Sequence, residues 1–122
     1  MVYMSSTDAL AVLEVRVHLP RYIPGTYVFV SADIPDRLIE RVEDYAVFPI
    51  NWRDDLDWTR SIGLKFIAET WSVALSVPSR IVPASRNIVI NPSHAQFSQV
   101  VIHPPRPFNW DPRLWDRVLE TF

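Results

Sequence analysis

Proline is the residue that most restricts what this chain can fold into. Eleven prolines are spread along 122 residues, whereas glycine occurs only twice. Because proline continues neither a helix interior nor a central strand, the regular elements between the prolines have to be short. The two glycines, Gly25 and Gly63, are also too few to build a glycine-rich phosphate loop. The sequence therefore predicts short elements and excludes the P-loop and the dinucleotide-binding fingerprint.

Composition places the chain among ordinary globular proteins. Hydrophobic residues make up 48% and charged residues 21%, and the length suits one domain over residues 1–122. A net charge of −2 argues against direct binding of nucleic acid, and no run of about 20 apolar residues predicts a membrane span. The chain has no cysteine, and its start lacks the features of a signal peptide. We therefore expect a cytoplasmic protein without disulfides or thiolate metal sites.

Hydrophobic spacing predicts an α+β domain, with a short-stranded mixed sheet and flanking helices. Helices are expected from a cap at Ser6, Thr7 or Asp8 to about His18, over residues 57–71, and from about Pro112. Strands are expected at residues 26–35, 73–78, 87–92 and 100–103, with one or two helical turns at 93–100. Residues 50–58 are expected to form a loop, and residues 36–45 fit either a short helix or a strand.

An acid and an imidazole stand four residues apart in the otherwise apolar segment LAVLEVRVHLP. On a helix, Glu14 and His18 lie on one face, where they can form a weak surface pair. The apolar residues around them leave no wide polar face, so at least one of the two side chains is expected to point into the protein. A carboxylate in such a place needs hydrogen-bond partners. The pair is thus either a structural contact or part of a functional site.

Other polar residues also allow two interpretations. The three histidines match no metalloenzyme spacing, which predicts surface or capping roles and no metal site; they are His18, His94 and His103. Ser79, Asn87 and Asn91 stand at the ends of two expected strands. Next to proline they are typical turn residues, although hydroxyls and amides at strand ends can also present hydrogen bonds to a ligand.

The five tryptophans divide into two groups. Trp71 and Trp115 fall within apolar helical patterns and fit a core or a partner surface. Trp52, Trp58 and Trp110 stand beside acids in expected loops and can line a pocket. Few basic residues are interleaved with them, so a stacking platform for nucleic-acid bases is not expected.

Several ordered motifs resemble those of RES-domain proteins, the toxins of RES–Xre toxin–antitoxin modules. They are VYMSSTDALAVLEVRVHLP, INWRD, TRSIG, SVPSRIVPASRNIVINPSHAQF and PFNWDPRLW, which together span residues 2–115. The family is named for an arginine, a glutamate and a serine. Glu14 matches that glutamate and Ser79 that serine, while Tyr3 and His18 match a tyrosine before the helix and a histidine after the glutamate.

The resemblance implies a fold similar to ADP-ribosyltransferase toxins and NAD⁺ as the substrate, without a metal. Members break the bond between nicotinamide and ribose and pass ADP-ribose to phosphate, water or a protein. Glu14 and Ser79 are then the catalytic residues: Glu14 stabilises the cationic ribose, and Ser79 bonds the amide or the ribose. Tyr3 and His18 belong to the NAD⁺ site, with Tyr3 against the nicotinamide and His18 orienting Glu14. The implied partners are an Xre-type antitoxin that covers the cleft, a protein acceptor of ADP-ribose, and further copies of the chain in a homo-oligomeric complex.

The sequence departs from the family pattern at its start. In this family the domain begins earlier, with a strand that carries an arginine and then a Gly-Gly-Arg-Trp-Asn motif. Residue 1 falls close to the tyrosine that follows, so the chain is expected to be an N-terminally shortened RES domain. Arg16, Arg21 and Arg80 are candidates to replace the arginines that neutralise the pyrophosphate of NAD⁺. The alternative function is a catalytically impaired RES domain that only binds an antitoxin or another protein.

Overall fold

The fold consists of two short helices and eight short strands, seen in a computed structural model that describes residues 1–19, 21 and 25–115. The helices are α1 (Asp8–Arg16) and α2 (Leu56–Ala68). The strands are β1 (Val2–Ser5), β2 (Tyr27–Phe29), β3 (Ala32–Asp33), β4 (Ile39–Arg41), β5 (Ala74–Pro78), β6 (Arg86–Ile90), β7 (Val101–Ile102) and β8 (Arg106–Phe108). Short 3₁₀ turns lie at Asp36–Leu38, Val42–Asp44, Trp52–Asp54, Ala95–Gln99 and Pro112–Leu114. The longest strands have five residues, which confirms the prediction of short elements.

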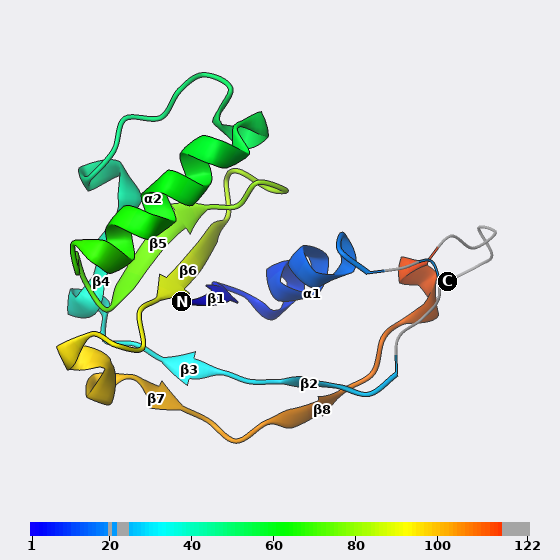
Figure 1. The fold of residues 1–122 in the computed structure, drawn as a ribbon. Helices are drawn as coiled ribbons and strands as arrows, with labels where there is room; N and C mark the ends of the chain where they lie inside the picture. Colours follow the sequence, from blue (N-terminus) through cyan, green and yellow to red (C-terminus); the bar gives the residue numbers. More distant parts are fainter. Residues whose placement is uncertain (20, 22–24, 116–122) are drawn as a thin grey trace.

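One four-stranded sheet organises the molecule (Figure 1). Its strand order is β1-β6-β5-β4, in which β4 runs parallel to β5 and the other neighbours are antiparallel. Two further ribbons, β2–β8 and β3–β7, are each two-stranded and antiparallel. A mixed sheet with flanking helices confirms the predicted α+β class.

Each face of this sheet covers a separate part of the hydrophobic core. On one face, α2 packs Phe66 against Leu75 of β5 and Val89 of β6. On the other face, Ile90 of β6 belongs to a second cluster, which the segments around β3 and the 95–99 turn cover. Consecutive residues of β6 thus alternate between the two clusters, as the period of two in a strand requires. The centre of the sheet, in β5 and at the end of β6, is therefore buried on both faces.

Both predicted internal helices are present, with shifted ends. Thr7 caps α1 by accepting from the N–H of Leu10 at 3.1 Å, and the helix ends at Arg16, not at about His18. Asp55 caps α2 by accepting from the N–H of Trp58 at 2.9 Å, so Trp58, which falls in both the predicted loop at 50–58 and the predicted helix at 57–71, lies in the helix. Among the described residues, no helix combines the length and apolarity that a membrane span requires.

The strand predictions were less complete. β5, β6 and β7 lie where they were expected, but the single strand predicted at 26–35 is divided into β2 and β3. Residues 36–45 contain both alternatives, with β4 between two 3₁₀ turns. β1 and β8 were missed because both are short edge strands, and β8 contains Pro107. At Pro112 the structure has a 3₁₀ turn, and residues 116–122 of the predicted C-terminal helix lie outside the described residues.

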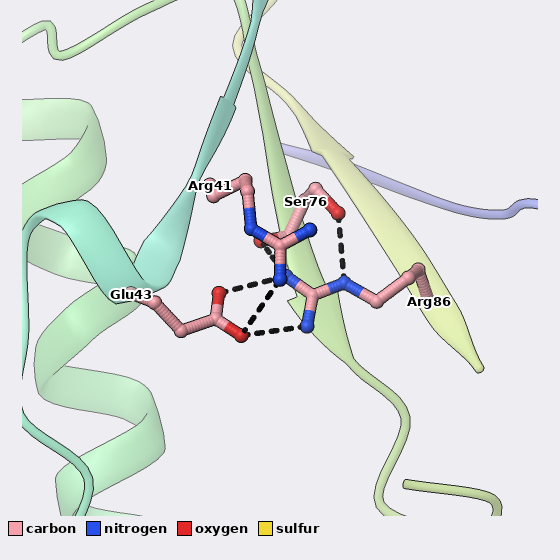
Figure 2. A network of polar contacts seen from close by, with 4 residues as sticks. All are labelled: Arg41, Glu43, Ser76 and Arg86. Atoms are coloured by element: carbon pink, nitrogen blue, oxygen red, sulfur yellow. Dashed lines mark hydrogen bonds and ion pairs between the residues drawn. The ribbon is translucent and has the colours of Figure 1, made fainter. Parts of the chain in front are cut away.

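An arginine network fastens the edge of the sheet (Figure 2). The guanidinium of Arg86 donates to both carboxylate oxygens of Glu43, at 2.7 and 2.8 Å, and its Nε donates to Ser76 Oγ at 2.9 Å. Arg41 adds an ion pair to Glu43 at 3.5 Å. The hydrogen bonds from Arg86 hold the pKa of Glu43 below its ordinary value of 4.5. The network therefore ties the 42–44 turn to β5 and β6.

Core packing under α2 gives the first prediction. Phe66 is fully buried, so Phe66→Ala should lower the free energy of unfolding by about 3–5 kcal/mol. Leu64 lies on the same helix but is 69% exposed, and Leu64→Ala should stay within about 0.5 kcal/mol of wild type. Urea denaturation followed by circular dichroism measures both. Equal losses in the two variants would contradict the packing of α2 on the sheet.

The arginine network predicts a pH-dependent contribution to stability. Because folding lowers the pKa of Glu43, its stabilising effect is complete above about pH 4.5 and disappears as the pH falls through the lower folded pKa. Glu43→Gln should therefore be less stable than wild type at pH 7, by up to about 1 kcal/mol because the carboxylate is partly exposed, and equal to it in strong acid. Thermal melts across pH measure this difference. Asp54→Asn, at an exposed site, serves as the control, and a Glu43→Gln difference that does not shrink in acid would contradict the prediction.

Candidate functional site

The carboxylate of Glu14 is held where α1 meets the ends of β5 and β6. Glu14 Oε1 accepts two hydrogen bonds, from Ser79 Oγ at 2.7 Å and from Asn87 Nδ2 at 2.7 Å. The side chain is half-buried, so one oxygen is fixed while the carboxylate keeps contact with the cavity beside it. The expectation that at least one side chain of the Glu14–His18 pair points into the protein is confirmed by Glu14, which also has the polar partners that a carboxylate there needs.

Ser79 donates its hydrogen bond to Glu14 from a buried position. Its side chain is fully buried, and its Oγ accepts from the backbone N–H groups of Ile81 and Val82, each at 3.1 Å. Because these two donors occupy the oxygen's lone pairs, the hydroxyl hydrogen is directed to Glu14. Ser79 does not line the cavity. In the structure the hydroxyl of Ser79 is directed to Glu14 and the loop after β5, and a direct bond from Ser79 to a ligand stays a prediction.

Asn87 is a site residue whose role the sequence did not reveal. Its amide stands between two partners: Nδ2 donates to Glu14, and Oδ1 accepts from Ser5 Oγ at 2.8 Å. Ser5 lies directly opposite Asn87 in the antiparallel pairing of β1 with β6. This pairing depends on a strand that was not predicted, so the sequence offered no signal that would distinguish Asn87 from a turn residue. Asn91, at the other end of β6, is buried and accepts from the N–H of Ser93.

Helix α1 is anchored at its C-terminal end as well. Arg16 Nε donates to the carbonyl oxygen of Leu114 at 2.8 Å, and its guanidinium lies 4.5 Å from the ring centroid of Trp115. With Thr7 capping the other end, α1 is fixed between β1 and the turn at Pro112–Leu114. This anchoring decides where the carboxylate of Glu14 lies.

A cavity of about 800 Å³ opens beside Glu14. Its walls come from α1, β1, the 52–63 region including α2, and the facing ends of β5 and β6. Small-molecule sites in proteins fall in this range of volume and are also mostly apolar with a few polar groups. Trp52 and Trp58 line it, which confirms that these tryptophans line a pocket, and Trp110 lines a second cavity of about 400 Å³.

Tyr3 and His18 both line the larger cavity. Tyr3 is 69% exposed on β1 and is therefore available to a ligand. His18 is exposed and follows the end of α1, where its N–H donates to the carbonyl of Val15. Among the described residues, no hydrogen bond joins its ring to Glu14. The predicted helical pair is not formed, because the α-helix ends two residues before His18.

The remaining histidines have structural roles. His94 Nδ1 accepts from the N–H of Gln96 at 3.0 Å and so caps the 95–99 turn. His103 Nε2 lies 2.8 Å from Asp33 Oδ2, which joins the ribbon β3–β7. Over the part of the chain that the structure describes, no group of three or more His, Cys, Asp or Glu side chains is placed to hold a metal ion.

Comparisons with known proteins agree on one family. A family model described as the RES domain matches residues 1–111. A protein named "Toxin Res" from Yersinia enterocolitica is 32% identical over 117 residues, covering 93% of this chain and 76% of that protein. "Toxin Res" from Photorhabdus laumondii is also 32% identical, with 93% and 74% covered. "Prs ADP-ribosylating toxin" from a Sphingobium species is 31% identical, with 93% and 73% covered.

The Ser79 contacts predict a structural cost that is independent of any activity. Ser79→Ala leaves the N–H groups of Ile81 and Val82 without their acceptor and removes one donor from Glu14. The free energy of unfolding should fall by about 1–3 kcal/mol. Ser98→Ala, at an exposed position, should change it by less than about 0.5 kcal/mol. Urea titrations of both variants measure this, and a Ser79→Ala protein as stable as wild type would show that these bonds do not hold the loop.

Proposed function

The chain belongs to the RES domain family, and we propose from this that it is the toxin of a toxin–antitoxin module that cleaves NAD⁺ between nicotinamide and ribose. The observation that supports this most directly is the Glu14 carboxylate, held by Ser79 and Asn87 at the wall of a cavity of about 800 Å³. The name of the Sphingobium relative, an ADP-ribosylating toxin, supports NAD⁺ as the substrate.

The proposed chemistry follows from the charge that develops during cleavage. As the C1′–N bond breaks, its electron pair leaves with neutral nicotinamide and the ribose ring becomes cationic, as in glycoside hydrolysis. A carboxylate fixed beside the ring stabilises that charge without having to reorient. Oε1 of Glu14 is occupied by its two donors, so Oε2 is the oxygen left to face the ribose. Water, phosphate or a protein side chain then takes the ADP-ribose.

The other site residues take supporting roles in this proposal. Tyr3, exposed on the cavity wall, lies against the nicotinamide, and His18 contributes to binding from the end of α1. Ser79 and Asn87 position Glu14 instead of contacting the reacting atoms. The reaction needs no metal, because the leaving group is already activated by its positive charge.

The proposed partner is an antitoxin of the Xre type, in a complex that contains more than one copy of the toxin. A function limited to binding such a partner remains the second candidate, and β1 favours it. Among the described strands β1 pairs only with β6, so its other edge is open, and Val2 and Tyr3 on it are exposed.

Incubation of the purified chain with NAD⁺ tests the first function. Nicotinamide should be released, and Glu14→Gln should lower kcat by about a hundredfold or more because the neutral amide cannot stabilise the cationic ribose. Glu69→Gln, outside the cavity, is the matched control and should retain full activity. Chromatography with and without inorganic phosphate measures nicotinamide and identifies the ADP-ribose product. An absence of NAD⁺ loss, or equal rates for wild type and Glu14→Gln, would leave only the binding function.

A further inference from the structure

The charged residues around the larger cavity do not match the charge of the chain as a whole. The chain carries a net charge of −2, yet its cavity lining contains Arg60 and Arg80 with Glu14 as the lining carboxylate. Arg60 comes from α2 and Arg80 from the loop that follows β5. Most of the remaining lining is apolar, and both arginines are exposed at the cavity, where a ligand can reach them from solvent. The cavity is therefore suited to a ligand that carries negative charge.

The side chains of Arg60 and Arg80 are not held by other described residues. Among the described residues, neither guanidinium has a hydrogen bond or an ion pair, whereas Arg16 and Arg86 are each held by protein partners. A guanidinium has five donor hydrogens in a planar fork. Both side chains are exposed, so their donors face solvent and are accessible. The free donors of Arg60 and Arg80 are available to a ligand.

The backbone that carries Arg80 is fixed next to the Glu14 site. Arg53 Nε donates to the carbonyl oxygen of Arg80 at 2.9 Å, and its Nη2 lies 3.5 Å from the carbonyl oxygen of Ile81. The preceding residue is Ser79, the donor to Glu14, and adjacent Cα atoms are about 3.8 Å apart. Arg80 is thus the direct neighbour of the residue that positions the carboxylate, and it lines the same cavity.

We infer that Arg60 and Arg80 form a phosphate-binding subsite in the cavity beside Glu14. The inference rests on the proposed function, in which NAD⁺ is the ligand. In NAD⁺ the pyrophosphate is attached to C5′ of the ribose that loses nicotinamide, so a phosphate site has to lie within one ribose of Glu14. Arginine binds phosphate oxygens through paired, charge-assisted hydrogen bonds, which suits this position. The same chemistry would also hold inorganic phosphate that attacks the ribose.

The structure shows which of the arginines considered in the sequence analysis line the cavity. Arg16 is engaged with Leu114 and Trp115, and neither Arg16 nor Arg21 lines the cavity. Arg80 lines it, and Arg60, which the sequence did not single out, lines it as well. The two residues come from segments 20 positions apart along the chain, so only the folded structure brings them to one cavity.

Calorimetric titration with ADP-ribose and, separately, with inorganic phosphate tests the subsite without requiring turnover. Arg80→Gln and Arg60→Gln should each weaken binding of ADP-ribose by about fivefold to tenfold. Arg37→Gln is the matched control, because Arg37 is exposed, pairs with Gln99 and does not line the cavity. In turnover assays the two cavity variants should raise KM for NAD⁺ more than they lower kcat. Thermal melts of all variants exclude unfolding as the cause.

The outcomes show whether the subsite binds the pyrophosphate or free phosphate, and they test the subsite separately from NAD⁺ cleavage. Weaker ADP-ribose binding assigns the subsite to the pyrophosphate. Unchanged ADP-ribose binding with a loss of inorganic phosphate binding assigns it to free phosphate. If wild type binds neither probe, or if the cavity variants bind both as Arg37→Gln does, the inference is overturned. If the arginines govern ADP-ribose binding but wild type releases no nicotinamide, the subsite stands and the proposed cleavage fails.

Discussion

Two hydrogen bonds to a single oxygen of Glu14 hold the site together. A carboxylate removed from water is costly unless donors replace its hydration, and Ser79 and Asn87 supply them at 2.7 Å each. The direction of each bond is fixed further out: backbone N–H groups fill the lone pairs of Ser79, and Ser5 orients the amide of Asn87. In this set of hydrogen bonds each group therefore has a fixed role as donor or acceptor. Glu14 is therefore presented in one orientation.

The sheet supplies the rigidity that this arrangement needs. Residues 74–76 of β5 and 89–90 of β6 are buried in the packed core, and Ser79 and Asn87 stand at the adjoining ends of the same two strands. A ligand would occupy the cavity beside these strands, which α2 also lines. Sites built on strands and helices in this way keep their groups in position better than sites built on loops alone.

The features that could be predicted from the sequence are those that depend on the spacing of residues close together in the chain. The spacing of apolar residues located α1, α2, β5 and β6, and the apolar surroundings of Glu14 and His18 indicated that at least one of these two side chains turns inward, which is Glu14. The role of Asn87 could not be predicted, because it depends on the pairing of β6 with β1, which lies more than 80 residues away in the chain. Ser79 was predicted as a site residue from the family resemblance, but its burial and its hydrogen bond to Glu14 are properties of the tertiary structure.

The short connection between β1 and α1 has a consequence for how such a centre can change over time. Only Ser6 and Thr7 separate the two elements, and Thr7 is already the cap of the helix. An insertion of one residue there would turn α1 by about 100° about its axis and carry the acidic side chain away from its donors. Lengthening β1 itself would exchange its inward and outward residues. The spacing from Ser5 to Glu14 is therefore expected to tolerate substitutions far better than changes in length.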